Sequence, residues 1–198
     1  MFDGLARAIQ AYRPGRPESG WFFAGLASSF PNIDNDHEGS LAEKNIPAPC
    51  EPAGGSTTAS IPACKVFRVP LPSGPRGNAE AEAVPLTEAA EEGADLRNQV
   101  LVFQYRGKFH AVDHQKQCPH SSFPLSRGSP FDIEDFGVVL STGIACPKHG
   151  WSFDLFSGQG DRGSYRLKIW EVELRDTDKG LNSTQEKEVW VRRKQRIG

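Results

Sequence analysis

The chain has 198 residues, of which 37% are hydrophobic, and a formal net charge of −2. This length is sufficient for one ordinary domain with its own core plus an additional segment. No apolar run approaches the roughly 20 residues that a membrane-spanning helix needs, and the small net charge gives no general attraction to nucleic acid or anionic lipid. The start lacks the order of a signal peptide, so a cytoplasmic location is expected. Arg7, Arg13 and Arg16 suggest a mitochondrial presequence as the alternative.

Residues 1–62 are expected to form a mostly irregular N-terminal extension and linker. Residues 3–12 have the pattern of a short helix that Pro14 and Pro17 would end. Residues 47–62 consist largely of Pro, Ala, Gly, Ser and Thr, which is typical of a linker. The aromatic segment 20–33 is too apolar for a solvated tail, and we expect it to dock on the following domain rather than to serve as a partner-binding peptide.

From Lys65 onwards the pattern indicates β-structure. Strands are predicted over 65–69, 100–105, 109–113, 136–140, 152–154, 165–174 and 188–192, with a helical turn near 88–92. Arg106-Gly-Lys108 is a hairpin signal between the second and third of these strands. Short strands at close spacing, without a long amphipathic helix, predict a small antiparallel all-β domain over residues 63–198.

Two short boxes carry the chemistry of the chain: Cys118-Pro-His120 and Cys146-Pro-Lys-His149. Each box supplies one thiolate and one imidazole, a donor set that suits zinc, copper or an iron–sulfur centre. Single Cys and His residues are more often ordinary core groups, but two matched boxes are hard to explain in that way. Structural zinc usually takes two cysteines first and two histidines later, whereas the order here alternates.

The segments Cys118-Pro-His-Ser-Ser-Phe-Pro-Leu125 and Cys146-Pro-Lys-His-Gly-Trp-Ser-Phe-Asp154 resemble the two cluster-binding boxes of the Rieske iron–sulfur family. The resemblance extends to Ser157-Gly158 and covers roughly residues 65–192. It implies a Rieske-type β domain with a two-loop cluster-binding subdomain that holds a [2Fe–2S] cluster. It further implies that Cys118 and Cys146 bind one iron, and that His120 and His149 bind the other iron at the exposed tip.

Departures from the respiratory-chain Rieske pattern define the expected subtype. The boxes carry no additional cysteine, so no disulfide is expected between the two loops. Trp151 and Phe153 occupy the positions where those proteins place Ser and Tyr hydroxyls near the cluster. Fewer hydrogen bonds to the cluster predict a potential near the low end of the Rieske range, roughly −150 mV. Residues 130–136 are expected to form an added loop with an acidic tip, either a solvated surface or a docking surface for a basic redox partner.

The resemblance implies a monomeric electron carrier, a ferredoxin-like oxidoreductase component with no catalytic activity of its own. Its expected partners are a flavin-dependent reductase and an acceptor oxygenase or reductase. Electron and proton uptake are expected to be coupled through the histidine ligands. The alternatives are an electron-transfer subunit of a Rieske oxygenase or nitrite reductase system, and a redox or iron sensor. A complete oxygenase is not expected, because His37, His110 and His114 are not spaced as a mononuclear iron site.

Overall fold

The computed structural model of the chain describes residues 20–34, 39–43, 45–47, 60–69, 81–91, 95–114, 123–177 and 186–194. The expected helix over 3–12 and most of the expected linker lie outside these residues. None of the helices in the described part of the chain has the length and apolar character needed to cross a bilayer.

The central sheet is built around β7 (Gln99–Tyr105). One edge of β7 pairs with β8 (Lys108–Asp113), and the other pairs with β5 (Cys64–Arg68) and, in parallel, with β2 (Asn32–Ile33). Beyond β5 lie β6 (Glu82–Val84) and the single-turn helix α1 (Leu86–Ala89). The β7–β8 hairpin turns through Arg106 and Gly107, both with positive φ, which is the two-residue turn that matches the strand twist.

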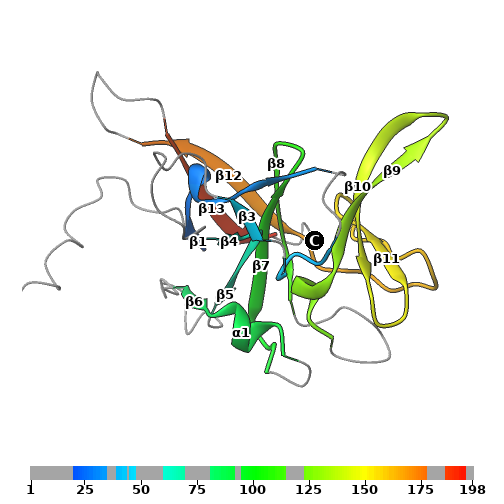
Figure 1. Cartoon of the computed structure of the whole chain (residues 1–198), viewed down its shortest axis with the longest axis horizontal. Coiled ribbons are helices and arrows are strands. Elements are labelled where there is room, and N and C mark those ends of the chain that lie inside the picture. Colours follow the sequence, from blue (N-terminus) through cyan, green and yellow to red (C-terminus); the bar gives the residue numbers. More distant parts are fainter. Residues whose placement is uncertain are drawn as a thin grey trace, which may run out of the picture.

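Two further three-stranded antiparallel sheets flank the central sheet (Figure 1). One has the order β1 (Trp21–Leu26), β13 (Lys187–Arg193), β12 (Trp170–Asp176). The other has the order β11 (Trp151–Asp154), β10 (Val138–Cys146), β9 (Ser129–Asp135). Two short 3-10 helices cover Ala27–Ser29 and Leu125–Arg127, and a separate pair joins β3 (Asn45–Pro47) to β4 (Ser60–Pro62).

The side chains of β7 alternate between two hydrophobic cores, because successive residues of a strand face opposite sides of the sheet. Val100 and Val102 pack with the β1–β13–β12 sheet, in a core that includes Phe22 and Trp170. Leu101, Phe103 and Tyr105 face the β9–β10–β11 sheet, in a core completed by the set Phe123, Leu125, Ile144, Cys146, Trp151 and Phe153. One strand, buried on both faces, thus joins the two outer sheets.

The all-β antiparallel fold is confirmed, and the hairpin predicted at residues 106–108 is present, with Lys108 as the first residue of β8 rather than part of the turn. The segment 20–33 packs on the domain as expected, but it does so as strands: β1 pairs with β13 and β2 pairs with β7. Phe22 lies 5.5 Å from Phe67 and 6.3 Å from Trp170 between ring centroids. Residues 21–33 of the expected irregular extension therefore contribute to the sheets and to the core of residues 63–198.

Residues 130–136 do not form the expected loop. They lie in β9 and in the turn that follows it, and β9 pairs with β10 over its length. Phe136 and Gly137 both have positive φ, so this turn has the same form as the β7–β8 turn. The acidic side chains of this segment favoured a loop in the sequence analysis, although the segment forms a strand. The twisted hairpin of β9 and β10 extends away from the rest of the fold (Figure 1).

Candidate metal centre

The second box forms a tight turn between β10 and β11. Cys146 is the last residue of β10 and pairs with Trp151, the first residue of β11. The Gly150 amide donates a hydrogen bond to the Cys146 carbonyl at 3.0 Å, and Gly150 has a φ of +65°, which glycine adopts without strain. The turn therefore fixes the backbone positions of Cys146 and His149 relative to each other.

The two candidate ligands of this box lie in different environments. Cys146 is 1% exposed and belongs to the core that faces Leu101 and Phe103. His149 is exposed at the surface of the same turn. A buried sulfur beside a surface imidazole is a donor pair that suits an iron–sulfur cluster at the edge of a protein.

Cys118 and His120 of the first box lie outside the described residues, which resume at Phe123. Phe123 is buried and packs beside the second box, since the Lys148 ammonium lies 5.4 Å from the centroid of its ring. The described flank of the first box thus contacts the turn that carries Cys146 and His149. In the part of the chain that the structure describes, no three His, Cys, Asp or Glu side chains converge to hold a metal ion.

His114 connects the two described segments that flank the first box, a role that the sequence did not reveal. This residue is fully buried, its Nδ1 lies 3.0 Å from the Gln99 Oε1, and its Nε2 lies 3.1 Å from the Ser126 Oγ. The Ser126 amide also donates to Nε2 at 3.3 Å, so Nε2 is an acceptor and Nδ1 carries the proton. Burial of the imidazole lowers the pKa of His114 to about 4, which keeps the ring neutral.

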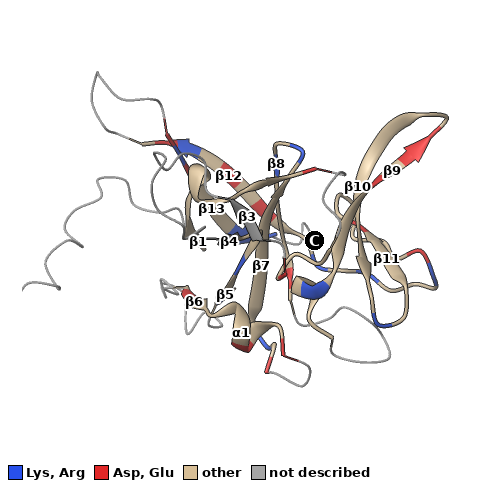
Figure 2. Cartoon of the chain, in the orientation of Figure 1, with Lys and Arg blue, Asp and Glu red and all other residues tan. Residues whose placement is uncertain are grey.

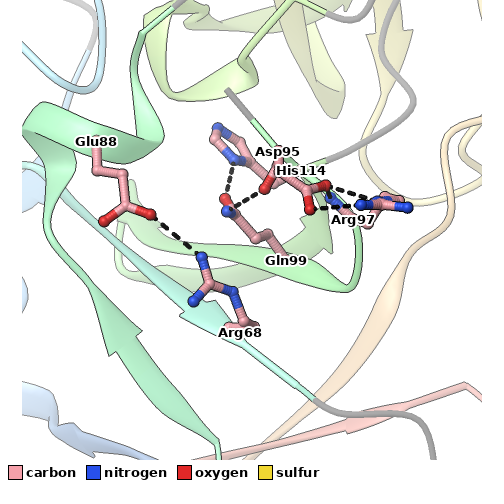
Figure 3. A network of polar contacts seen from close by, with 6 residues as sticks. All are labelled: Arg68, Glu88, Asp95, Arg97, Gln99 and His114. Carbon is pink, nitrogen blue, oxygen red and sulfur yellow. Dashed lines mark hydrogen bonds and ion pairs between the residues drawn. The ribbon is translucent and has the colours of Figure 1, made fainter. Parts of the chain in front are cut away.

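The network continues from His114 towards the surface (Figure 3). The Gln99 side-chain amide donates to the Asp95 carbonyl at 2.8 Å, and Arg97 donates two hydrogen bonds of 2.8 Å to the Asp95 carboxylate. The hydrogen bonds from Arg97 lower the pKa of Asp95 to about 2. The start of β7 is thereby connected to both described flanks of the first box.

The N-terminal region also contacts the 3-10 helix that follows the first box. The amides of Leu41 and Ala42 donate to the carbonyls of Gly128 and Ser126 at 3.0 and 2.7 Å, and Leu41 is fully buried. Nothing in the composition of residues 39–43 indicates this contact. The 3-10 helix Leu125–Arg127 therefore lies between the N-terminal segment and His114.

A loop after β11 packs against the second box. The Ser152 amide donates to the Asp161 carboxylate at 3.1 Å, and the Asp161 amide donates to the Ser152 carbonyl at 2.9 Å. The Tyr165 ring makes an edge contact with the ring of Trp151, with 5.4 Å between centroids. Residues 161–166 thus form a third element beside the turn, in addition to the two boxes.

Ser157-Gly158, which the sequence resemblance included, has a structural role. The Asp154 carboxylate accepts hydrogen bonds from the amides of Phe156 and Ser157 at 2.9 and 2.6 Å, which forms a tight turn. Gly158 has a φ of +75°, and a Cβ atom there would lie 2.2 Å from the Leu167 carbonyl oxygen. Only glycine allows the chain after Tyr165 to approach this closely.

The Rieske [2Fe–2S] domain family matches the chain over residues 79–167, a range that contains both boxes. Residues 79–167 form a Rieske [2Fe–2S] domain. This family binds a [2Fe–2S] cluster, and the donor chemistry of Cys146 and His149 on their shared turn fits that group. The Rieske domain includes β7 to β11, which are the strands that position the second box.

Two solved structures show similarity to the chain. One is of an oxidoreductase proposed to be the small subunit of an NADPH nitrite reductase; it is 25% identical over 46% of this chain and 74% of that chain, with a TM-score of 0.32. The other is of a proposed NADH-dependent nitrite reductase small subunit from Mycobacterium tuberculosis; it is 22% identical over 49% of this chain and 74% of that chain, with a TM-score of 0.34. None of the curated proteins matches the chain.

Proposed function

We propose that this Rieske protein is an electron carrier whose cluster is held by Cys118, His120, Cys146 and His149. The observation that carries this proposal is the turn after β10, where a buried thiol and an exposed imidazole lie three residues apart beside the flank of the first box. His120 precedes Phe123 by three residues, a stretch of chain that spans at most about 11 Å. The first box is therefore within reach of the second.

The residues of the second box have separate tasks in this proposal. Cys146 would supply its thiolate from the core, where β10 and β11 fix it and exclude water. His149 would supply its imidazole at the surface, where a partner can approach closely. When bound, the cluster supplies a one-electron couple, and the neutral imidazoles raise its potential above that of an all-cysteine cluster.

Spectroscopy of ligand variants tests the ligand set. We expect the dithionite-reduced protein to show the EPR signal of a Rieske cluster, and we expect Cys146→Ser and His149→Gln to lose the signal or shift it strongly. Cys64→Ser and His110→Gln are matched controls, because both residues lie in the described fold outside the boxes and should leave the signal unchanged. A colourless protein that contains zinc, or an unchanged signal in both box variants, would contradict the proposal.

We further propose that a flavin-dependent reductase supplies the electrons and that an oxygenase or reductase accepts them. The cluster itself takes up one electron at a time, so the donor must convert the two-electron chemistry of NAD(P)H into single electrons. Stopped-flow mixing of the oxidised protein with an NAD(P)H-dependent flavin reductase from the same cells should bleach the visible absorbance in a second-order reaction. Bleaching by dithionite but by no reductase fraction would contradict the assignment of the donor.

A further inference from the structure

Basic side chains surround the end of β10 that carries Cys146. Lys148 lies within the turn itself and is exposed. Arg127 lies at the end of the 3-10 helix that follows the first box, and Arg162 lies in the loop beside the second box. We refer to Arg127, Lys148 and Arg162 together as the basic collar.

Aromatic rings hold the collar in place. The ring of Phe123 has the Lys148 ammonium 5.4 Å and the Arg127 guanidinium carbon 5.9 Å from its centroid. The ring of Trp151 has the Arg162 guanidinium carbon 5.9 Å from its centroid. Contacts of a cation with an aromatic face restrict long side chains at little cost in desolvation. The positive charges therefore remain beside the cluster site and do not spread over the surface.

Basic residues outnumber acidic residues around the cluster site. The described segments 123–128, 146–152 and 161–167 contain four basic residues, which are Arg127, Lys148, Arg162 and Arg166, and one acidic residue, Asp161, whose carboxylate lies 3.5 Å from the Arg162 Nε. The chain as a whole has a net charge of −2, so this excess is local. Two anionic thiolates would balance the charge of an oxidised [2Fe–2S] core, and reduction would add one negative charge, fewer than the three positive charges of the collar.

The end of β10 that is far from Cys146 has acidic rather than basic residues around it. The hairpin segment 129–140 contains no Lys or Arg, and its exposed acidic residues are Glu134 and Asp135, whereas the Asp132 carboxylate is buried and pairs with Arg106 at 2.9 Å. Figure 2 shows acidic residues along β9 towards the hairpin tip, and basic residues where β10 and β11 meet the neighbouring loops. The strand rises about 3.3 Å per residue, so Val138 lies about 26 Å from Cys146 along β10. A partner bound at the acidic tip would be far from the cluster.

We propose that the basic collar is the docking surface for an electron-transfer partner protein that presents acidic residues around its own redox group. This inference rests on the proposed electron-carrier function and names the chemistry of the partner. Complementary charges steer two proteins into the orientation in which the charged rims meet, and here that orientation places the partner against the exposed edge at His149. It differs from one of the two interpretations that the sequence left open for residues 130–136, the docking of a basic partner, and is compatible with the other, a solvated surface.

Two anionic probes and one cationic probe test whether the surface at the collar acts as a positively charged one. Oxidation of the reduced holoprotein is followed by stopped flow with ferricyanide, which takes one electron to become ferrocyanide, and with hexaammineruthenium(III), which takes one electron to become the ruthenium(II) ion. Binding of poly-L-glutamate is followed separately through the fluorescence of the protein, since Arg162 lies over the Trp151 ring. The binding measurement does not depend on electron transfer.

The variants reverse charge inside and outside the collar. Lys148→Glu/Arg162→Glu changes two collar residues, and Arg127→Glu/Arg162→Glu does the same while leaving the turn between Cys146 and His149 untouched. The matched control is Lys108→Glu/Lys187→Glu, since these exposed lysines begin β8 and β13 away from the cluster site. The EPR signal of each variant shows whether the cluster is intact.

We expect the wild-type rate with ferricyanide to fall as salt is added and the rate with hexaammineruthenium to rise. At low ionic strength both collar variants should react at least about tenfold more slowly with ferricyanide and bind poly-L-glutamate at least about tenfold more weakly. The control variant should stay within about twofold of wild type. Equal rates and equal polyglutamate affinities in all variants would overturn the docking surface. If the protein took up no single electrons, the carrier function would be overturned instead. The polyglutamate result would still show whether the collar binds acidic chains.

Discussion

The buried imidazole of His114 makes the stability of this protein dependent on pH. Burial lowers its pKa from 6.5 to about 4 in the folded protein, whereas the unfolded chain keeps the ordinary value. The unfolded state therefore binds the proton more tightly. The stability that the neutral ring provides is present above pH 6.5 and is lost as the pH falls towards 4.

The size of this effect follows from the two pKa values. Between pH 7.5 and pH 5, the preference of the proton for the unfolded chain reduces the free energy of unfolding by about 2 kcal/mol from this residue alone. In the described part of the chain, the side chains that hydrogen-bond the ring are those of Gln99 and Ser126, which are neutral and do not offset the loss. The holoprotein should be visibly less resistant to urea at pH 5.

The assay compares urea unfolding of the wild-type holoprotein and two variants at pH 7.5 and pH 5. His114→Gln removes the titrating group, so its loss of stability between these pH values should be about 2 kcal/mol smaller than that of wild type. Ser126→Ala keeps the imidazole and removes one hydrogen-bond partner, so it should be less stable at both pH values with the pH dependence retained. An unchanged pH dependence in His114→Gln would refute the reasoning.

Three further predictions concern the fold and the cluster. Gly158→Ala should reduce the free energy of unfolding in thermal melts by about 2–4 kcal/mol, because the new Cβ would collide with the Leu167 carbonyl at a positive φ. In the control Gly137→Ala, which has a similar φ and open space around the Cβ, the free energy of unfolding should fall by only about 1 kcal/mol. Trp170→Phe should reduce the free energy of unfolding by about 1–3 kcal/mol, because it leaves the buried Asp113 without the 2.7 Å hydrogen bond from the indole. Denaturant unfolding with an unchanged slope should show a lower midpoint, and an unchanged midpoint would contradict this prediction. The redox potential should be roughly −150 mV by dye-mediated titration, and a value well above 0 mV would reject it.

Local residue chemistry was sufficient to predict much of the fold. The alternation in residues 99–113 and the Arg106-Gly107 turn depend on neighbouring residues, so the sequence located this hairpin. The cofactor prediction likewise depends on a few side chains in fixed order, since the Cys and His of two boxes define the donor chemistry, and the Rieske family match covers both boxes. The acidic strand β9 was missed because its pairing with β10 outweighs the low strand propensity of Asp and Glu.

The two boxes that pointed to a Rieske centre are properties of the sequence, because metal-ligand chemistry is carried by residue types at short spacing. What surrounds them was decided by tertiary structure alone. The His114–Ser126 contact joins the two described flanks of the first box, and the contacts of the basic collar likewise join separate segments of the chain. The contribution of the N-terminal strands to the core is of the same kind. Contacts of this kind arise when a shared core brings distant segments together, and no local pattern records them.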